Sequence, residues 1–390
     1  MKKVLFSFFL LLTAVVGRAA DFEVDGIYYN ITSAEELSVE VTRGGYAYSG
    51  NVVIPESVTY DDNTYRVTAI GKEAFYGCYC LTSVTIPNSV TAIGEGAFAN
   101  CEGLTSVIIP HSVATIGDNA FYLCCSLTSV TIPNSVTRIS GHAFYRCGGL
   151  TSVTIPDSVT EIGDDAFAYC YGLTSVTIPH SVTTIGDNAF FYCSNLASIT
   201  LGNSVTTIGY RAFYRCGGLT SVTIPHSVTE IGKGAFYECN GLTSISIPNS
   251  VVGIGDEAFA YCSGLTSITI GNSVTIIGSF AFNSCIALKD VYCLAETVPN
   301  TGSYAFNGVK QSSATLHVPA ASSEAYSVTK PWSVFGQIVT IGEGDGIEQL
   351  ASEEGTASFK NPTVYDLGGT RVSNPRKGIY VIRGRKTVVK

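Results

Sequence analysis

Residues 81–103 read LTSVTIPNSVTAIGEGAFANCEG, and closely similar segments recur along most of the chain. The clearest marker of the repeat is a cysteine that stands three positions after an Ala-Phe pair and three before a leucine. Ten cysteines recur at intervals of 23 residues: Cys78, Cys101, Cys124, Cys147, Cys170, Cys193, Cys216, Cys239, Cys262 and Cys285. A constant period in the twenties is typical of a solenoid, in which each repeat forms one coil stacked on the last.

The first half of the unit has the pattern of a short strand. Leu81, Val84 and Ile86 alternate with Ser and Thr, so one side of the strand is apolar and faces the coil interior. Pro87 ends the strand because it cannot donate a hydrogen bond to a neighbouring strand. Coils stacked through such strands would lie about 4.8 Å apart.

The second half of the unit supplies a turn and more core. Ile93 indicates a second short apolar edge, and Gly94 predicts a turn that needs a permissive backbone. Three residues with helical spacing are expected to pack inward as one helical turn: Ala97, Phe98 and Cys101. The sequence therefore predicts a β-rich solenoid of 23-residue repeats, with short parallel strands and single helical turns, whose core is continuous only when coils stack.

The N-terminus has the features of an export signal. Lys2 and Lys3 precede an apolar run over residues 4–16, and small residues follow, ending in Ala19 and Ala20. This order predicts a secretory signal peptide over residues 1–20. The run is too short to favour a membrane span, so we expect a secreted or cell-surface protein with no transmembrane span in the mature chain.

The charge is divided unevenly. Loss of the signal removes three basic residues, which changes the formal charge from −9 to −12. Residues 360–390 hold eight basic residues and one acid, a net +7, so the region between carries −19. A body this acidic repels phosphate backbones, which argues against nucleic acid as a partner.

Thirteen cysteines in an exported chain would normally indicate disulfides. Here the ten periodic cysteines would form one column with two equivalent neighbours each, which favours buried, reduced thiols. Cys80, Cys125 and Cys293 fall outside the column and are the better candidates for redox chemistry.

The remaining columns form the surface. Ser83 and Thr85 begin two columns, repeated in steps of 23, that should face outward as a field of hydroxyls. The position after the proline holds His111, His180 and His226, with Asn or Asp in the other coils. Two neighbouring columns beside the buried Phe position carry aromatic residues, with Arg146 and Arg215 interspersed: Tyr122, Tyr145, Tyr169, Phe191, Tyr192, Tyr214, Tyr237 and Tyr261.

These tyrosines and the three histidines are the predicted partner-binding residues. Tyrosine is enriched in interfaces because it offers apolar area and a hydrogen bond at modest entropic cost. The partners would be extracellular proteins, from the host matrix or other cell surfaces; the alternative is glycans, stacked on the tyrosines and hydrogen-bonded by the hydroxyl field. A third interpretation gives the tyrosines no partner, and they only shield the Phe column from water.

No constellation for catalysis, a cofactor or a metal is present. His180 and His226 lie two coils apart, about 10 Å, whereas a shared zinc needs its ligands within roughly 2.1 Å. The chain contains no G-x-S-x-G elbow, and a cysteine repeated ten times in a packed column is not a nucleophile. We therefore expect no enzyme activity.

The motif LTSVTIPNSVTAIGEGAFANC resembles the BspA-type leucine-rich repeat of bacterial surface proteins, over about residues 50–342. The resemblance implies an elongated right-handed coil and a role in adhesion to host matrix proteins, plasma proteins or partner bacteria. It also implies a hairpin at the insert over residues 60–65. Departures are small: Gly202 and Gly271 replace the proline, and Ser140 replaces the turn glycine.

The ends of the array differ from the repeats. We predict an N-terminal cap over 21–51, repeats over 52–292, an atypical repeat and cap over 293–342, a linker over 343–358 and a basic β-hairpin tail over 359–390. The cap includes Trp332, expected to plug the end of the coil. The tail resembles the C-terminal sorting tails of Bacteroidetes secreted proteins, which implies surface sorting or anchoring; the alternative is a basic hairpin docked on the acidic body.

Overall fold

The computed structural model describes residues 20–341 and four strands between residues 364 and 389. The chain divides into two compact units, Met1–Ala351 and Ser352–Lys390. The predicted signal peptide, apart from Ala20, and the predicted linker over 343–358 lie outside the described residues.

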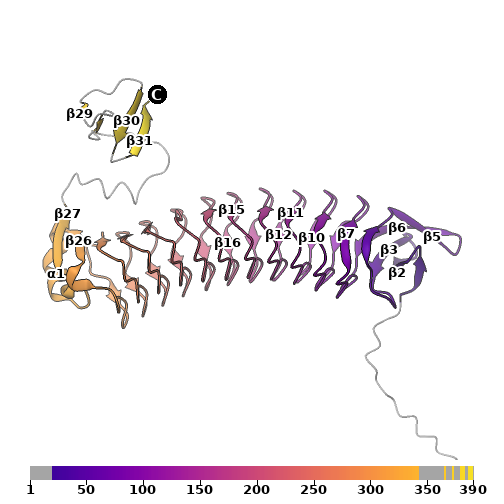
Figure 1. Ribbon diagram of the computed structural model, residues 1–390, viewed down its shortest axis with the longest axis horizontal. Coiled ribbons are helices and arrows are strands. Elements are labelled where there is room, and N and C mark those ends of the chain that lie inside the picture. Colours follow the sequence, from indigo (N-terminus) through magenta and orange to yellow (C-terminus); the bar gives the residue numbers. More distant parts are fainter. Residues whose placement is uncertain (1–19, 342–363, 366–370, 373–377, 383–384, 390) are drawn as a thin grey trace, which may run out of the picture. The chain divides into compact units, whose positions relative to one another are not determined.

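Residues 50–341 form a stack of coils that share two columns of short strands (Figure 1). The first strand column contains β4 (Gly50–Val53), β7 (Leu81–Thr85), β9 (Ser106–Ile108), β11 (Ser129–Thr131), β13 (Ser152–Thr154), β15 (Ser175–Thr177), β17 (Ser198–Thr200), β20 (Ser244–Ser246), β22 (Ser267–Ile270), β24 (Asp290–Cys293), β26 (Thr315–Pro319) and β27 (Gln337–Ile341). Ser221 completes it through an isolated parallel bridge to Ser198.

The second strand column contains two-residue strands: β8 (Ala92–Ile93), β10 (Thr115–Ile116), β12 (Arg138–Ile139), β14 (Glu161–Ile162), β16 (Thr184–Ile185), β18 (Thr207–Ile208), β19 (Glu230–Ile231), β21 (Gly253–Ile254), β23 (Ile276–Ile277) and β25 (Asn300–Thr301). Pairing between repeats is parallel and in register, so that Val130 lies beside Val153 and Ile139 beside Ile162. The predicted β-solenoid of 23-residue coils with short parallel strands is confirmed.

The predicted helical turn is replaced by tighter turns. The amide of Ala97 donates to the carbonyl of Gly94 at 3.2 Å, and that of Cys101 donates to Phe98 at 3.2 Å. Between them, the amide of Phe98 donates to Ala120 of the next coil at 2.8 Å. The expectation of a helical turn was wrong because inward residues at 97, 98 and 101 fit two linked turns equally well, and the turns leave alternate amides free to bond the next coil.

The core is a stack of phenylalanine rings. From Phe75 to Phe306, the rings of successive coils lie 4.9–5.6 Å apart and nearly parallel. The rings of Phe75 to Phe282 are fully buried, and Phe306 is 2% exposed. One coil alone would expose its ring faces, so stacking itself creates the apolar core.

The thiol column lies beside the rings. All thirteen cysteines are free, and the ten periodic ones are buried. From Cys101 onward, each thiol donates to a Phe carbonyl of a preceding coil, as Cys170 does to Phe144 at 3.1 Å. Burial raises the pKa of the Cys193 thiol to about 12. The predicted column of reduced core thiols is confirmed.

The three cysteines outside the column differ among themselves. Cys80 and Cys125 are exposed. Cys293 is buried, and its sulfur lies 3.2 Å from the hydroxyl of Tyr326. Its choice as a redox candidate was wrong, because β24 turns this side chain into the core of the C-terminal cap.

The turn glycine is required for space rather than for backbone conformation. A Cβ on Gly186 would lie 2.8 Å from the backbone nitrogen of Asp164 in the coil before, closer than such atoms approach. Its φ angle is not in the left-handed region. Stacked coils approach closely here, which disfavours a side chain, although one coil holds Ser140 at this position, with its hydroxyl bonded to the Ile116 carbonyl at 2.6 Å.

The N-terminal cap is a small sheet of β1 (Phe22–Val24), β2 (Ile27–Ser33), β3 (Ser38–Thr42), β5 (Ser57–Tyr60) and β6 (Asn63–Ile70). β5 and β6 pair antiparallel around Asp61 and Asp62, both with positive φ, so the expected hairpin is present. β3 then pairs parallel with β6, which joins the cap to the second strand column.

The C-terminal cap is helical. It contains η1 (Gln311–Ser313), η2 (Ala320–Ser322), α1 (Ser323–Val328) and η3 (Trp332–Val334). Trp332 is fully buried and meets the last ring, Phe306, edge-on at 5.3 Å, as expected of a plug. None of the helices in the described part of the chain is long and apolar enough to cross a membrane.

The second unit is an antiparallel sheet in the order β29 (Arg371–Val372), β28 (Val364–Tyr365), β30 (Gly378–Ile382) and β31 (Arg385–Val389). The predicted hairpin is present as β30 and β31, but two further strands extend it.

Candidate partner-binding surface

The predicted tyrosines come together as one continuous row, which we call the aromatic ladder. It consists of Tyr122, Tyr145, Tyr169, Phe191, Tyr192, Tyr214, Tyr237 and Tyr261. Successive ring centroids lie 4.4–5.4 Å apart along the whole row, from Tyr122 to Tyr261. The structure therefore places all seven predicted tyrosines in a single surface.

The ladder stays continuous by using two positions of the repeat. Tyr145 and Phe191 occupy one column, but the coil between them has Ala168 there. The next residue, Tyr169, fills the gap and meets Tyr145 and Phe191 edge-on at 5.4 and 5.3 Å. Tyr261 extends the row in the same way beside Ala260, 5.2 Å from Tyr237. In the sequence the tyrosines stand in two separate columns, so only the structure shows that they form one continuous row.

Three ladder tyrosines have an unfavourable backbone. The φ angles of Tyr169, Tyr192 and Tyr261 are 59–60°, in the left-handed region. The position has a positive φ in all ten coils, including those that hold Asn100 and Leu123, so the left-handed turn belongs to the repeat itself. A bulky aromatic residue there costs of order 1 kcal/mol.

The ladder is not needed to keep water from the Phe column. Phe98 lies beside Ala99 and Asn100, with no aromatic residue at either ladder position of its own coil, and is still fully buried. The ladder residues themselves are half-buried, and Tyr261 is 43% exposed. These observations argue against shielding as the sole role of the tyrosines.

Stacking leaves the edges of the rings, not their faces, toward solvent. The planes of Tyr122 and Tyr145 differ by 3°, and those of Tyr214 and Tyr237 by 4°, so each ring covers its neighbour's face. Burial raises the pKa of the Tyr237 hydroxyl to about 12, so it remains a hydrogen-bond donor at neutral pH. The surface thus offers ring edges and hydroxyls.

Arginine side chains stack on the ladder. The Arg146 guanidinium lies 5.0 Å from the Tyr169 ring centroid, and that of Arg215 lies 4.9 Å from Tyr192. Arg211, which sequence reasoning missed, lies 5.0 Å from Tyr214 and 4.7 Å from Tyr210. Its signal was weak because Tyr210 and Arg211 occur at these positions in only one coil.

The predicted histidines do not join this surface. His111, His180 and His226 are exposed, and no ring contact links them to the ladder within residues 20–341. His180 has a local role, since its Nδ1 accepts the amide of Asn203 in the next coil at 3.0 Å. Across the same residues, no group of three or more His, Cys, Asp or Glu is placed to hold a metal ion.

The hydroxyl field has the predicted orientation. Thr131, Thr154, Thr177, Thr200 and Thr223 are all exposed on the first strand column. The column is interrupted by the 76% exposed Ile108.

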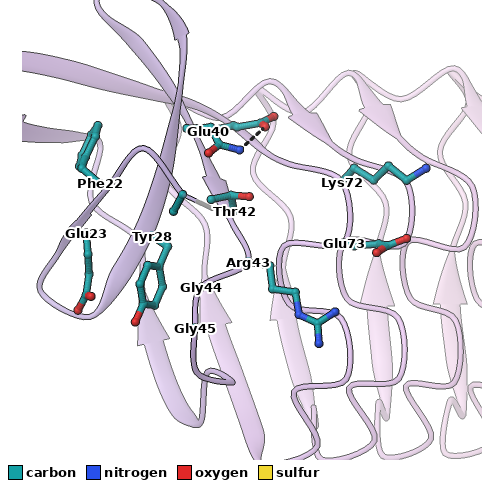
Figure 2. A pocket seen from close by; sticks show the side chains of 12 residues that line it. Phe22, Glu23, Tyr28, Glu40, Thr42, Arg43, Gly44, Gly45, Lys72 and Glu73 are labelled. Atoms are coloured by element: carbon teal, nitrogen blue, oxygen red, sulfur yellow. Dashed lines mark hydrogen bonds between the residues drawn. The ribbon is translucent and has the colours of Figure 1, made fainter. Parts of the chain in front are cut away.

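A cleft of about 840 Å³ lies between the N-terminal cap and the first coil. Glu40 lies in the upper part of the view in Figure 2, and it accepts a hydrogen bond from the Asn30 side chain at 3.4 Å. Lys72 at its rim pairs with Glu95 at 2.9 Å, and Arg43 lies 5.6 Å from the Tyr76 ring. Acidic and basic side chains both line the cleft, so its charge does not indicate one class of ligand. The repeat pattern did not predict this cleft because the cap lies outside the period.

Comparison with known proteins identifies the family. The model of the BspA type leucine rich repeat region matches residues 68–197 and 183–313, with six copies, and so spans more than half of the chain. The chain belongs to the BspA-type leucine-rich repeat family. No functionally curated protein matches it.

Solved structures include similar chains. A leucine rich cell surface protein from Faecalibacterium prausnitzii is 30% identical, covering 86% of this chain and 98% of that one, with a TM-score of 0.56. A leucine-rich repeat protein from Bacteroides ovatus is 26% identical, covering 83% and 100%, with a TM-score of 0.48. The pneumococcal vaccine antigen PcpA is 19% identical, covering 83% and 98%, with a TM-score of 0.43.

Proposed function

We propose that this protein is displayed at the cell surface or secreted, and binds an extracellular protein along its aromatic ladder without catalysis. The continuity of the ladder supports this most strongly. Seven tyrosines and one phenylalanine remain in ring contact over seven coils, although two coils have alanine at the main ladder position. Each additional coil adds a modest contact, and a partner that spans several coils gains from all of them.

The alternative partner, a glycan, fits this surface less well. Sugar rings bind aromatic residues face to face, but in the parallel pairs Tyr122–Tyr145 and Tyr214–Tyr237 the facing sides of the rings are occupied by the neighbouring ring. Ring edges and hydroxyls suit the side chains and backbone of a protein. The Ser and Thr field remains available for hydrogen bonds to sugars, and this keeps the glycan as the competing outcome.

The test replaces Tyr145, Tyr214 and Tyr237 together by Phe, and in a second variant by Ala. Pull-downs with the mature protein measure capture of extracellular matrix proteins and of polysaccharides separately. We expect Phe to weaken protein capture and Ala to abolish it, with thermal unfolding checking the fold. A matched control replaces Thr154, Thr177 and Thr200 by Ala on the hydroxyl field. Loss of polysaccharide capture alone would favour the glycan, and unchanged capture in both assays would reject the ladder.

Residues 359–390 are proposed to sort or anchor the protein at the surface. The support is the resemblance of this tail to sorting tails and its net positive charge. Deletion of residues 360–390, followed by cell fractionation, should shift the protein from the surface to the medium or periplasm. Unchanged display would refute a sorting role and favour the docked hairpin.

A further inference from the structure

Arg211 is a charged side chain without a counter-ion. In the part of the chain that the structure describes, the ion pairs of arginine and lysine are Lys72–Glu95, Arg138–Glu161 and Arg215–Glu238, and Arg211 belongs to none of them. Its Nε is buried and has no hydrogen-bond partner. Because desolvation of an unpaired polar group is costly, the Nε–H of Arg211 is a hydrogen-bond donor left unused within the chain.

The surroundings hold the Arg211 side chain in one position. Its guanidinium stacks between the rings of Tyr210 and Tyr214, at 4.7 and 5.0 Å from their centroids. The next coil has Gly234 at the equivalent position, and a Cβ there would lie 3.2 Å from the Arg211 Cγ. The aliphatic stem therefore packs over a glycine, and the planar group is oriented before any ligand arrives.

The coil of Arg211 and the next coil carry one more basic than acidic side chain. Residues 203–242 carry Arg211, Arg215 and Lys233 against Glu230 and Glu238. Glu238 is engaged by Arg215 at 2.6 Å, and Glu230 lies on β19 in the second strand column. Lys233 is exposed and occupies the position of Tyr210 in the next coil. Its backbone carbonyl accepts a hydrogen bond from the Arg211 backbone amide at 2.9 Å. Arg211 and Lys233 are thus two basic side chains outside the ion pairs of the described residues, flanked by Asp187 of the coil before and by Asp256 and Glu257 of the coil after Lys233.

We propose that Arg211, assisted by Lys233, binds a carboxylate of a short acidic segment in the protein partner, an inference that rests on the proposed function of the ladder. A guanidinium that lies over the rings of two tyrosines presents its N–H donors along its outer edge, where a carboxylate can accept two of them. Tyr and Arg in a part-buried cluster are the residues that most often dominate interface energy. A long polyanion would meet the acidic coils on either side, which favours a short acidic segment over nucleic acid or a sulfated glycan.

The experiment measures binding of a short amidated peptide of alternating glutamate and tyrosine to the mature protein at low salt, by fluorescence anisotropy. A peptide with glutamine in place of glutamate is the ligand control, and dextran sulfate is a separate arm. We expect the glutamate peptide to bind, and Arg211→Gln to weaken it about tenfold or more. Lys233→Gln should weaken it about twofold to threefold, with less effect at high salt. Arg211→Lys should restore only part of the affinity, because lysine lacks the planar fork.

The control is Arg138→Gln, which removes a more exposed, ion-paired arginine from β12 and should leave peptide binding unchanged. Equal binding of both peptides, or full binding by Arg211→Gln, would overturn the inference. So would Arg211-dependent binding of dextran sulfate without binding of the glutamate peptide, which would indicate a sulfated glycan. The proposed function is tested apart from this, since Tyr145 lies three coils away: capture of proteins that depends on Tyr145 but not on Arg211 would refute the carboxylate site alone.

Discussion

Phe282 and Phe280 belong to the same coil, but Phe282 lies in the core and Phe280 on the surface. Replacing each by Ala therefore tests whether the buried rings stabilise the stack of coils. Phe282 is fully buried, and its ring is stacked between Phe259 at 5.6 Å and Phe306 at 5.2 Å. Phe280 is 37% exposed and has one ring contact, with Tyr304 at 5.2 Å.

The expected losses differ in size. Removal of a fully buried phenylalanine leaves a cavity and lowers the free energy of unfolding by about 3–5 kcal/mol. Phe280→Ala removes a part-exposed ring and one aromatic pair, worth about 0.5–1.5 kcal/mol. Both variants retain a Cβ and the same backbone, so the difference of roughly 2 kcal/mol or more reports burial.

The assay is guanidinium chloride unfolding followed by the emission of Trp332, the only tryptophan. Trp332 is fully buried against Phe306, which stacks on Phe282, so it reports on the coils that the substitutions affect. The transition of Phe282→Ala should shift to lower denaturant while its slope stays that of the parent. Equal losses in the two variants, or a larger loss for Phe280→Ala, would refute the argument that the inner rings carry the stability of the stack.

Three further outcomes follow from the structure. A thiol reagent should label Cys80 and Cys125 in the native protein and the eleven buried cysteines only on unfolding; rapid labelling of more than two would contradict the buried column. Because burial raises the pKa of Cys193 and Cys285 from 9.0 to about 12, the unfolded chain ionises first, so the free energy of unfolding should be fully present below pH 9 and fall between about pH 9 and 12. Denaturation measured along that range should show the fall, and Cys193→Val should reduce it by the share of one thiol. Gly186→Ala should lower the free energy of unfolding by about 1–3 kcal/mol because its Cβ would meet the backbone of the preceding coil, whereas Gly45→Ala, with open space around it, should be neutral in the same thermal melt.

The periodic parts of the fold were predictable because each column repeats the same environment. Ten identical spacings of Phe and Cys place those side chains in the core without any knowledge of backbone angles. The local conformation was less accessible, because inward residues at 97, 98 and 101 satisfy a helical turn and a pair of tight turns alike. The role of Gly186 depends on how closely two coils approach, which no single repeat reveals.

The candidate site was predictable in its residues but not in its geometry. The tyrosines were found as two columns, while the bridging of the Ala168 gap by Tyr169 depends on a left-handed backbone that the sequence does not announce. The histidines were predicted as partner-binding residues from their place in a surface column. At His180 the side chain instead accepts a hydrogen bond from the next coil. Arg211 was not predicted, because arginine occurs at this repeat position in one coil only and therefore forms no periodic pattern.

The equivalence of the coils also has a consequence for inheritance. Every repeat presents the same lower face and the same upper face, so a deletion or duplication of 23 residues rejoins surfaces that already fit. The array can therefore become longer or shorter by whole 23-residue coils, while the caps at its two ends stay unchanged.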